Sequence, residues 1–160
     1  MIRPVLKTDA KAICDIYNYY VENTIVTFEE ENVSVGEMQE RIEKVLQQHS
    51  WFVYEKEGEI VGYCYATGWR ARTAYRYSTE TTVYLKKGYE GNGVGTQLYK
   101  YLIQDLIRKD VHSFIGGISL PNEASVALHE KMGFKKIAHF SEVGQKFNKW
   151  IDVGYWQLVL

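Results

Sequence analysis

The chain has 160 residues, of which 46% are hydrophobic, so it is long and apolar enough for one domain over residues 1–160 with a real core. A formal net charge of −1 gives no general attraction to nucleic acid or to anionic membranes. Two cysteines build no disulfide framework, and no apolar run approaches the length of a membrane span.

The chain begins with a short strand and an amphipathic helix. Strand-like residues cover Ile2–Leu6, and Thr8 or Asp9 can cap the helix that follows. Apolar side chains then recur at helical spacing until residues 24–31 break the pattern. We therefore expect a loop over residues 24–31.

A second helix and a strand hairpin are expected next. Ser34–Glu37 has the form of a capping box, which marks the start of a helix. Strand-like segments cover residues 51–55 and 60–66, and Glu57–Gly58 between them indicates a tight hairpin turn. Residues 69–77 are polar, aromatic and basic, and they show no clear period.

The middle of the chain joins a strand to a helix through three alternate glycines. Residues 79–86 are rich in β-branched and aromatic side chains and predict the strand, and Gly91, Gly93 and Gly95 come after it. The apolar face expected for the helix consists of Val94, Leu98, Tyr101, Leu102 and Leu106.

Such a glycine loop suits a phosphate group, because glycine lets the backbone approach a ligand and the first turn of a helix has free N–H groups. A P-loop would place Lys and Ser or Thr after the last glycine, where this chain has Thr96 and Gln97. A dinucleotide fingerprint would read G-x-G-x-x-G in a first βαβ unit, which does not fit either. A tight turn that binds nothing is the remaining alternative.

The C-terminal part contains three further strands and one helix. Strands are expected over residues 114–119, 134–140 and 155–160, and a helix over residues 122–132. A polar loop is expected over residues 144–149. The mixed order of strands and helices predicts an α/β (α+β) domain with a central sheet that is part antiparallel and part parallel.

Two segments in this order, Glu80–Gly95 and Leu120–Phe134, resemble the GNAT superfamily of acetyl-CoA-dependent N-acetyltransferases. Within that superfamily the chain is similar to the phosphinothricin acetyltransferase-like branch, and the resemblance covers essentially the whole chain. The segments that match this branch are Ile16–Asn18, Thr27–Phe28, Trp69–Arg72 with Tyr75, Glu80–Tyr84, and Glu142–Phe147 with Trp150 and Asp152. The resemblance implies a mostly antiparallel sheet, splayed open where the cofactor binds, with flanking helices.

The resemblance implies acetyl-CoA as the acyl donor, held by the glycine loop and by the strand before it. The residues expected to contact it are Val83, Tyr84, Leu85, Gly91, Asn92, Gly93, Val94, Gly95, Thr96 and Asn122. Asn122 after a proline is also a good helix N-cap, and the two roles are compatible. Glu90 stands where the family usually has Gln or Arg, and a carboxylate there repels pyrophosphate unless it points away.

Glu80 and His129 are the candidate catalytic residues. Strand alternation places Glu80 on one face with Thr82 and Tyr84, and a carboxylate suits the core side of such a strand poorly. A carboxylate on a solvated surface is the alternative explanation. The resemblance implies that Glu80 takes a proton from the acceptor amine, and that His129 either protonates the leaving thiolate or only fills its place.

The resemblance also implies that Phe28, Arg72 and Tyr75 border the acceptor. Arginine pairs bidentately with carboxylates, so Arg72 favours an amino-acid-like acceptor such as phosphinothricin, methionine sulfone or methionine sulfoximine. Arg70 is expected to be a solvent-exposed charge. Transfer should be direct, because neither Cys14 nor Cys64 is placed for a covalent step.

Two alternatives remain at this stage. One keeps the donor but changes the acceptor to a protein N-terminus, a polyamine or an aminoglycoside. The other is an acetyl-CoA-binding regulator without turnover, for which Glu90 is the one supporting feature.

The expected partners are a small amine and a second copy of the chain. The resemblance implies that the region of Lys146, Phe147 and Trp150 helps to cover the acceptor pocket and meets the second copy in a homodimer. The four histidines have no metal-site spacing, and no nucleic-acid motif is visible. The N-terminus does not resemble a secretory signal, so the cytoplasm is the expected compartment.

Overall fold

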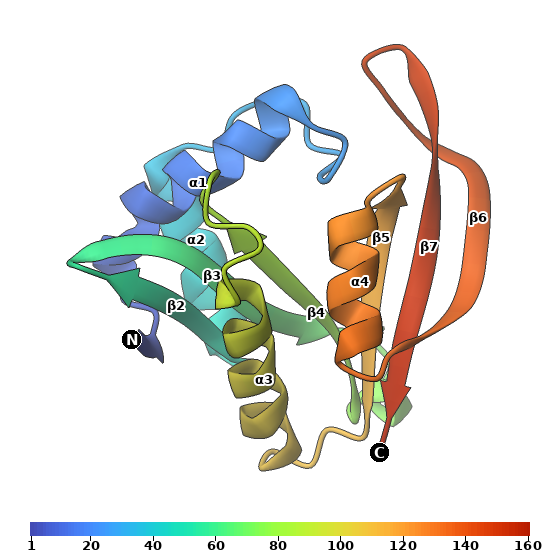
Figure 1. Cartoon of the computed structure of the whole chain (residues 1–160). Coiled ribbons are helices and arrows are strands. Elements are labelled where there is room, and N and C mark those ends of the chain that lie inside the picture. The colour runs from blue at the N-terminus through green and yellow to red at the C-terminus, as the bar shows by residue number, and fades with distance from the viewer.

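The computed structural model describes all 160 residues as a seven-stranded sheet covered by two helices on each face (Figure 1). The strand order is β1-β2-β3-β4-β5-β7-β6, and β4–β5 is the one parallel pair. The strands are β1 Ile2–Pro4, β2 Trp51–Lys56, β3 Glu59–Gly68, β4 Ser78–Leu85, β5 Ser113–Leu120, β6 Lys135–Lys146 and β7 Lys149–Val159. The helices are α1 Ala10–Asn23, α2 Val35–Leu46, α3 Val94–Ile107 and α4 Glu123–Lys131. This mixed, mostly antiparallel sheet confirms the predicted fold class.

The sheet is splayed between β4 and β5. These strands pair only where Ser78–Glu80 lies beside Ser113–Ile115, and beyond Glu80 they diverge (Figure 1). The edge of β4 that faces β5 therefore has no neighbouring strand after Glu80. Backbone groups on such an edge remain able to bind a ligand.

Side-chain alternation along β3 gives the sheet a separate core on each face. Tyr63 packs with Trp51 and the apolar residues of α1 and α2, whereas Cys64 and Ala66 pack with α3. Burial on both faces explains why this strand is almost continuously apolar rather than alternating.

The predicted caps are largely present. The Ser34 hydroxyl accepts a hydrogen bond from the Glu37 N–H at 3.1 Å, and the Asn122 side chain accepts one from the Ser125 N–H at 3.1 Å. Asp9 differs from the expectation, because its carboxylate accepts from the Leu6 N–H in a 3₁₀ turn that precedes α1.

The hairpin at the C-terminal end corrects the sequence-based expectation. The polar loop predicted over residues 144–149 is wrong, because β6 continues to Lys146 and β7 begins at Lys149. Only Phe147 and Asn148 form the turn, both with positive φ, and this backbone twist matches that of the flanking strands. Most of β6 is exposed, so its polar side chains are compatible with a strand.

Candidate functional site

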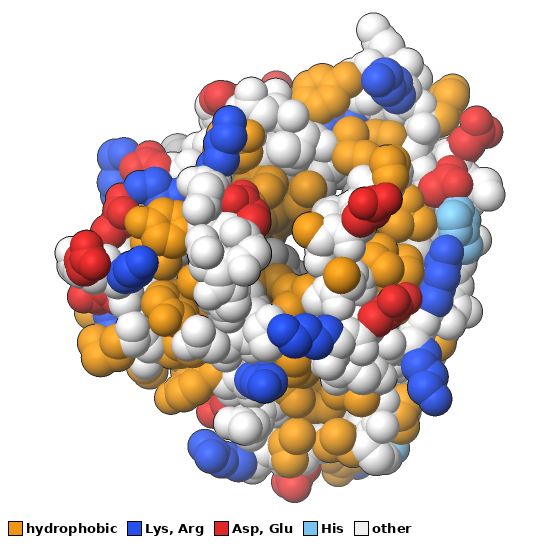
Figure 2. All heavy atoms as spheres, in the orientation of Figure 1, with side chains coloured by type: hydrophobic (Ala, Val, Ile, Leu, Met, Phe, Trp, Pro, Cys, Tyr) orange, Lys and Arg blue, Asp and Glu red, His pale blue; other side chains and the backbone are white.

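A cavity of about 710 Å³ lies where β4 and β5 part. Figure 2 shows the hollow between the two halves of the molecule, with hydrophobic side chains gathered around it. Its aromatic lining includes Phe28, Tyr65, Trp69, Phe140 and Tyr155, which come from the loop after α1, from β3 and the segment after it, and from β6 and β7. We call it the large cavity.

Glu80 lines the large cavity at the last paired position of β4 and β5. Gly117 of β5 lies close enough that a methyl group there would sit 3.4 Å from Oε1 of Glu80. Burial raises the pKa of Glu80, and the positive charge of Arg70 opposes that rise. A carboxylate with a raised pKa is a stronger base than an ordinary one and is suited to accept a proton.

Of Arg70 and Arg72, which precede β4, only one lines the large cavity. Arg70 lines the large cavity and packs on the Trp69 ring, with 4.8 Å between the guanidinium carbon and the ring centroid. All three of Arg70, Arg72 and Tyr75 are exposed, which confirms the expectation for Arg70, but Arg72 and Tyr75 are not among the residues that line the cavity. Phe28 does line it. The binding role of Arg72 stays a prediction, and the sequence contained no signal that favours Arg70 over it.

A smaller cavity of about 50 Å³ adjoins the large one on the side of α4. It is lined by Val83 and Asn122, which were predicted to contact acetyl-CoA, and by His129, which was predicted to be catalytic. The residues that line both cavities are Val26, Thr82, Tyr84, Gly117 and Ser119. The two cavities therefore meet beside Glu80. Leu85 lines neither of them, and its carbonyl accepts a hydrogen bond from the Tyr20 hydroxyl at 2.6 Å.

The glycine loop leaves backbone N–H groups open at the start of α3. Gly91 and Gly93 have φ values of 76° and 78°, which favour glycine, and a Cβ at Gly91 would meet no atom within 4 Å. Gly93 is the N-cap and offers no side chain to the first N–H groups of the helix, those of Val94, Gly95 and Thr96. This open cradle, which also includes Asn92, fits a pyrophosphate.

Glu90 is hydrogen-bonded outside this cradle. Its carboxylate accepts a hydrogen bond from the Gly88 N–H at 2.6 Å, in the turn before the glycines. The carboxylate stays close to the start of α3, so its repulsion of a pyrophosphate stays a prediction.

His129 is buried, with 4% of its surface exposed, and both ring nitrogens have partners. Nδ1 lies 2.7 Å from the Ser125 carbonyl oxygen, which can only accept, so Nδ1 carries the proton. Nε2 then accepts from the Tyr99 hydroxyl at 2.8 Å, and burial lowers the pKa of the ring. In this arrangement His129 is neutral and has no free N–H for a thiolate, so its catalytic role stays a prediction.

Tyr99 is the residue of this region that sequence reasoning missed. The expected apolar face of α3 contained Tyr101, but Tyr101 is 43% exposed and Tyr99 is fully buried. Tyr99 also lies 2.6 Å from the Thr81 hydroxyl, so its polar end is satisfied inside the core. A buried tyrosine with polar partners cannot be distinguished from an exposed one by spacing alone.

No group of three or more His, Cys, Asp or Glu side chains is arranged to hold a metal ion. None of the helices has the length and apolar character needed to span a membrane.

Comparison with known proteins identifies the family. Residues 2–154 match the model of the acetyltransferase (GNAT) domain. A phosphinothricin N-acetyltransferase of Streptomyces viridochromogenes is 36% identical over 98% of this chain and 85% of its own length. An L-methionine sulfoximine/L-methionine sulfone acetyltransferase of Salmonella typhimurium is 33% identical over 99% of this chain and 94% of its own.

A solved structure is similar throughout. It is a GNAT superfamily phosphinothricin acetyltransferase from Sinorhizobium meliloti in complex with acetyl-CoA. The TM-score is 0.96 and the sequence identity is 30%, and the aligned region covers 100% of this chain and 88% of the Sinorhizobium meliloti chain. The chain therefore belongs to the GNAT family of N-acetyltransferases, in the branch of the phosphinothricin N-acetyltransferases.

Proposed function

We propose that this chain, as one domain, transfers the acetyl group of acetyl-CoA to the amino group of a small amino-acid-like acceptor. Phosphinothricin, methionine sulfone and methionine sulfoximine are the acceptors that the names of its relatives suggest. The observation that carries the proposal is the position of Glu80, which lines the large cavity beside Gly117, a residue of both cavities.

The donor enters from the side of α3 and α4 in this proposal. The N–H groups at Gly93–Thr96 bind its pyrophosphate, and the free edge of β4 near Val83 and Tyr84 binds the pantetheine arm. The acetyl group then reaches the junction of the two cavities, and the acceptor occupies the large one.

Glu80 acts as the general base. It accepts a proton from the amine, whose nitrogen forms a bond to the thioester carbon while the carbon–sulfur bond breaks. A covalent enzyme intermediate is disfavoured, because Cys14 and Cys64 are buried and burial raises the pKa of both thiols.

An arginine binds the acceptor's carboxylate, and the candidates are Arg70 and Arg72. Substitution of each one distinguishes them. Replacement of Arg70, which lines the cavity, with Gln should raise the acceptor KM by about tenfold or more, since a charged hydrogen bond contributes about 1.5–3 kcal/mol. Arg72→Gln is the matched variant that tests the sequence-based expectation. Acetyl-CoA-dependent thiol release measures both.

The same assay with a panel of amines tests the proposed function as a whole. The panel contains the three amino-acid analogues, free amino acids, spermidine and a peptide N-terminus. Turnover confined to amino-acid-like acceptors supports the proposal, whereas turnover only on spermidine or the peptide contradicts it. Binding of acetyl-CoA without turnover on any amine would favour the regulator.

We also propose that the chain acts as a cytoplasmic homodimer. Val143, Phe147 and Trp150 of the hairpin are 59%, 53% and 63% exposed, and burial of such side chains favours association. Val143 also lines the large cavity, so a second copy covering the hairpin would help to close it. Light scattering that gave only the 18.6 kDa mass of one chain would refute the dimer.

A further inference from the structure

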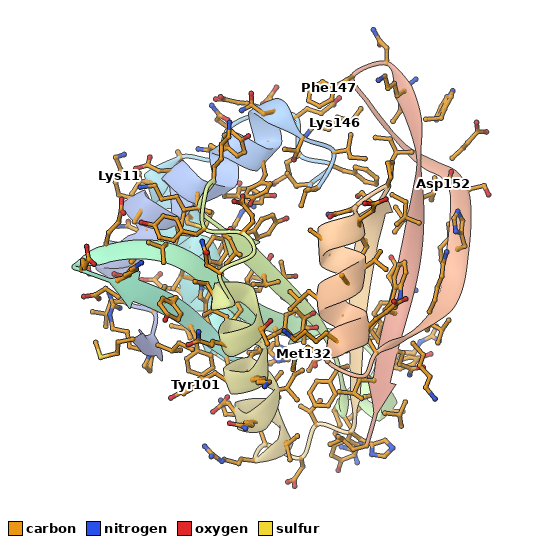
Figure 3. All side chains as sticks on the ribbon, in the orientation of Figure 1. Lys11, Tyr101, Met132, Lys146, Phe147 and Asp152 are labelled. Atoms are coloured by element: carbon orange, nitrogen blue, oxygen red, sulfur yellow. The ribbon has the colours of Figure 1, made fainter.

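Lys146 is a buried lysine without a carboxylate partner. It ends β6, just before the turn of the hairpin, beside the loop that follows α1 (Figure 3). Its residue surface is 2% exposed, and it takes part in none of the salt bridges of the chain. Nζ instead donates to the Thr27 carbonyl at 2.8 Å and lies 3.5 Å from the Tyr20 carbonyl.

This burial is not a general property of the hairpin turn. Lys149 pairs with Lys146 in the register of β6 and β7, yet it is exposed. Desolvation disfavours a buried ammonium and lowers the pKa of Lys146, against the weaker opposing effect of Glu30 and Glu29. The ammonium has two partial compensations, the Phe147 ring at 5.1 Å from Nζ and the hydrogen bond to the Thr27 carbonyl, and only the second reaches the loop after α1.

That contact joins two walls of the large cavity. Thr27 and Phe28 line the cavity from the loop, and Phe140 and Val143 line it from the hairpin. The loop and the hairpin are more than a hundred residues apart in sequence, and Lys146 connects them by a hydrogen bond.

A second contact of the same walls lies next to the lysine. The Phe28 ring packs so closely on the backbone of Gly144 that a methyl group at Gly144 would overlap it. Together these contacts fasten the loop to the hairpin at one polar and one apolar point.

Thr27 is also fixed from the side of α1. Its hydroxyl lies 2.8 Å from the hydroxyl of Tyr17, which donates to Glu29, and Glu29 pairs with Arg41. Tyr17 lines the large cavity as well. The hydrogen bond from Lys146 is therefore the polar contact that joins Thr27, and the residues that hold it, to the hairpin.

We propose that Lys146 is a positioning residue for the acceptor, because its ammonium holds the Thr27–Phe28 wall against the hairpin and so sets the width of the large cavity. The inference rests on the proposed function, in which the large cavity holds the acceptor.

The test compares Lys146→Met with Lys149→Met. Loss of the Lys146 ammonium should raise the acceptor KM by about tenfold, the effect of one hydrogen bond to a charged group, while the acetyl-CoA KM stays within about twofold. Hydrogen–deuterium exchange over residues 24–31 should accelerate in Lys146→Met and not in Lys149→Met. The exchange measurement does not depend on activity.

A second variant keeps the lysine and disturbs the other contact. Gly144→Ala should displace the Phe28 ring and also raise the acceptor KM selectively. If Lys146→Met does not fold, an unchanged acceptor KM in Gly144→Ala shows that the position of this wall does not matter and overturns the inference. An unchanged acceptor KM in folded Lys146→Met overturns the inference, as does an equal rise in both KM values. Absence of turnover by the unchanged protein would refute the proposed function instead, and the exchange comparison would still test the contact.

Discussion

Glu80→Gln is expected to lower acetyl transfer by about 10²- to 10⁴-fold, the range for loss of a positioned general base. Glutamine has nearly the same shape as glutamate, so the junction of the two cavities keeps its form and acetyl-CoA binding should change little. Steady-state kinetics and calorimetric titration of acetyl-CoA separate the two effects.

The pH dependence gives an independent readout of the same residue. Only the ionised carboxylate accepts a proton, and burial raises the pKa of Glu80. Activity should therefore fall as the pH decreases through a value above the ordinary glutamate pKa of about 4.3. Because Arg70 lowers this pKa, Arg70→Gln should move the acidic limb of kcat/KM to higher pH.

Glu142→Gln provides the matched control, since that residue is exposed and lines neither cavity. It should leave both the rate and the acidic limb unchanged. Full activity of Glu80→Gln, or an acidic limb that survives in it, would remove Glu80 from the mechanism.

Gly93→Val is expected to weaken acetyl-CoA binding by more than about tenfold. The residue has a φ of 78°, which costs an ordinary L-residue about 1–2 kcal/mol. A Cβ there has room within the chain, where its nearest atom is 3.9 Å away, so the main effect should be crowding of the pyrophosphate. Titration calorimetry with acetyl-CoA measures it.

Gly58→Val separates backbone strain from ligand crowding. Gly58 has a φ of 80° and open space around it, but it lies in the turn between β2 and β3. It should lower stability in a similar way and leave acetyl-CoA affinity unaffected. Equal affinity in Gly93→Val and in the unchanged protein would refute the placement of the pyrophosphate.

Glu90→Gln should act in the opposite direction at the same loop. The amide oxygen can still accept from the Gly88 N–H, and the negative charge near the start of α3 is lost. Charges near a helix end typically contribute 0.3–1 kcal/mol, so affinity should rise by about two- to fivefold at low salt. A decrease in affinity would mean that Glu90 assists binding.

Elements with a strong local signal were predictable from the sequence. The caps at Ser34 and Asn122 and the turn at Glu57–Gly58 depend on contacts within a few residues, and the structure confirms them. The end of β6 was not predictable, because irregular pairing near Phe140–Gly144 breaks the alternation on which strand prediction depends.

The sequence by itself determined the fold class, the glycine loop at the start of α3 and the family, because these depend on local spacing and on motifs in a fixed order. Only the tertiary structure decided that Arg70 rather than Arg72 lines the large cavity, that Tyr99 binds His129, and that Lys146 is buried beneath the loop after α1. The Tyr99 and Lys146 contacts join segments that are remote in sequence, and the Arg70 result distinguishes two nearby arginines. The direction of a side chain in such cases is set by packing between elements, which residue spacing does not contain.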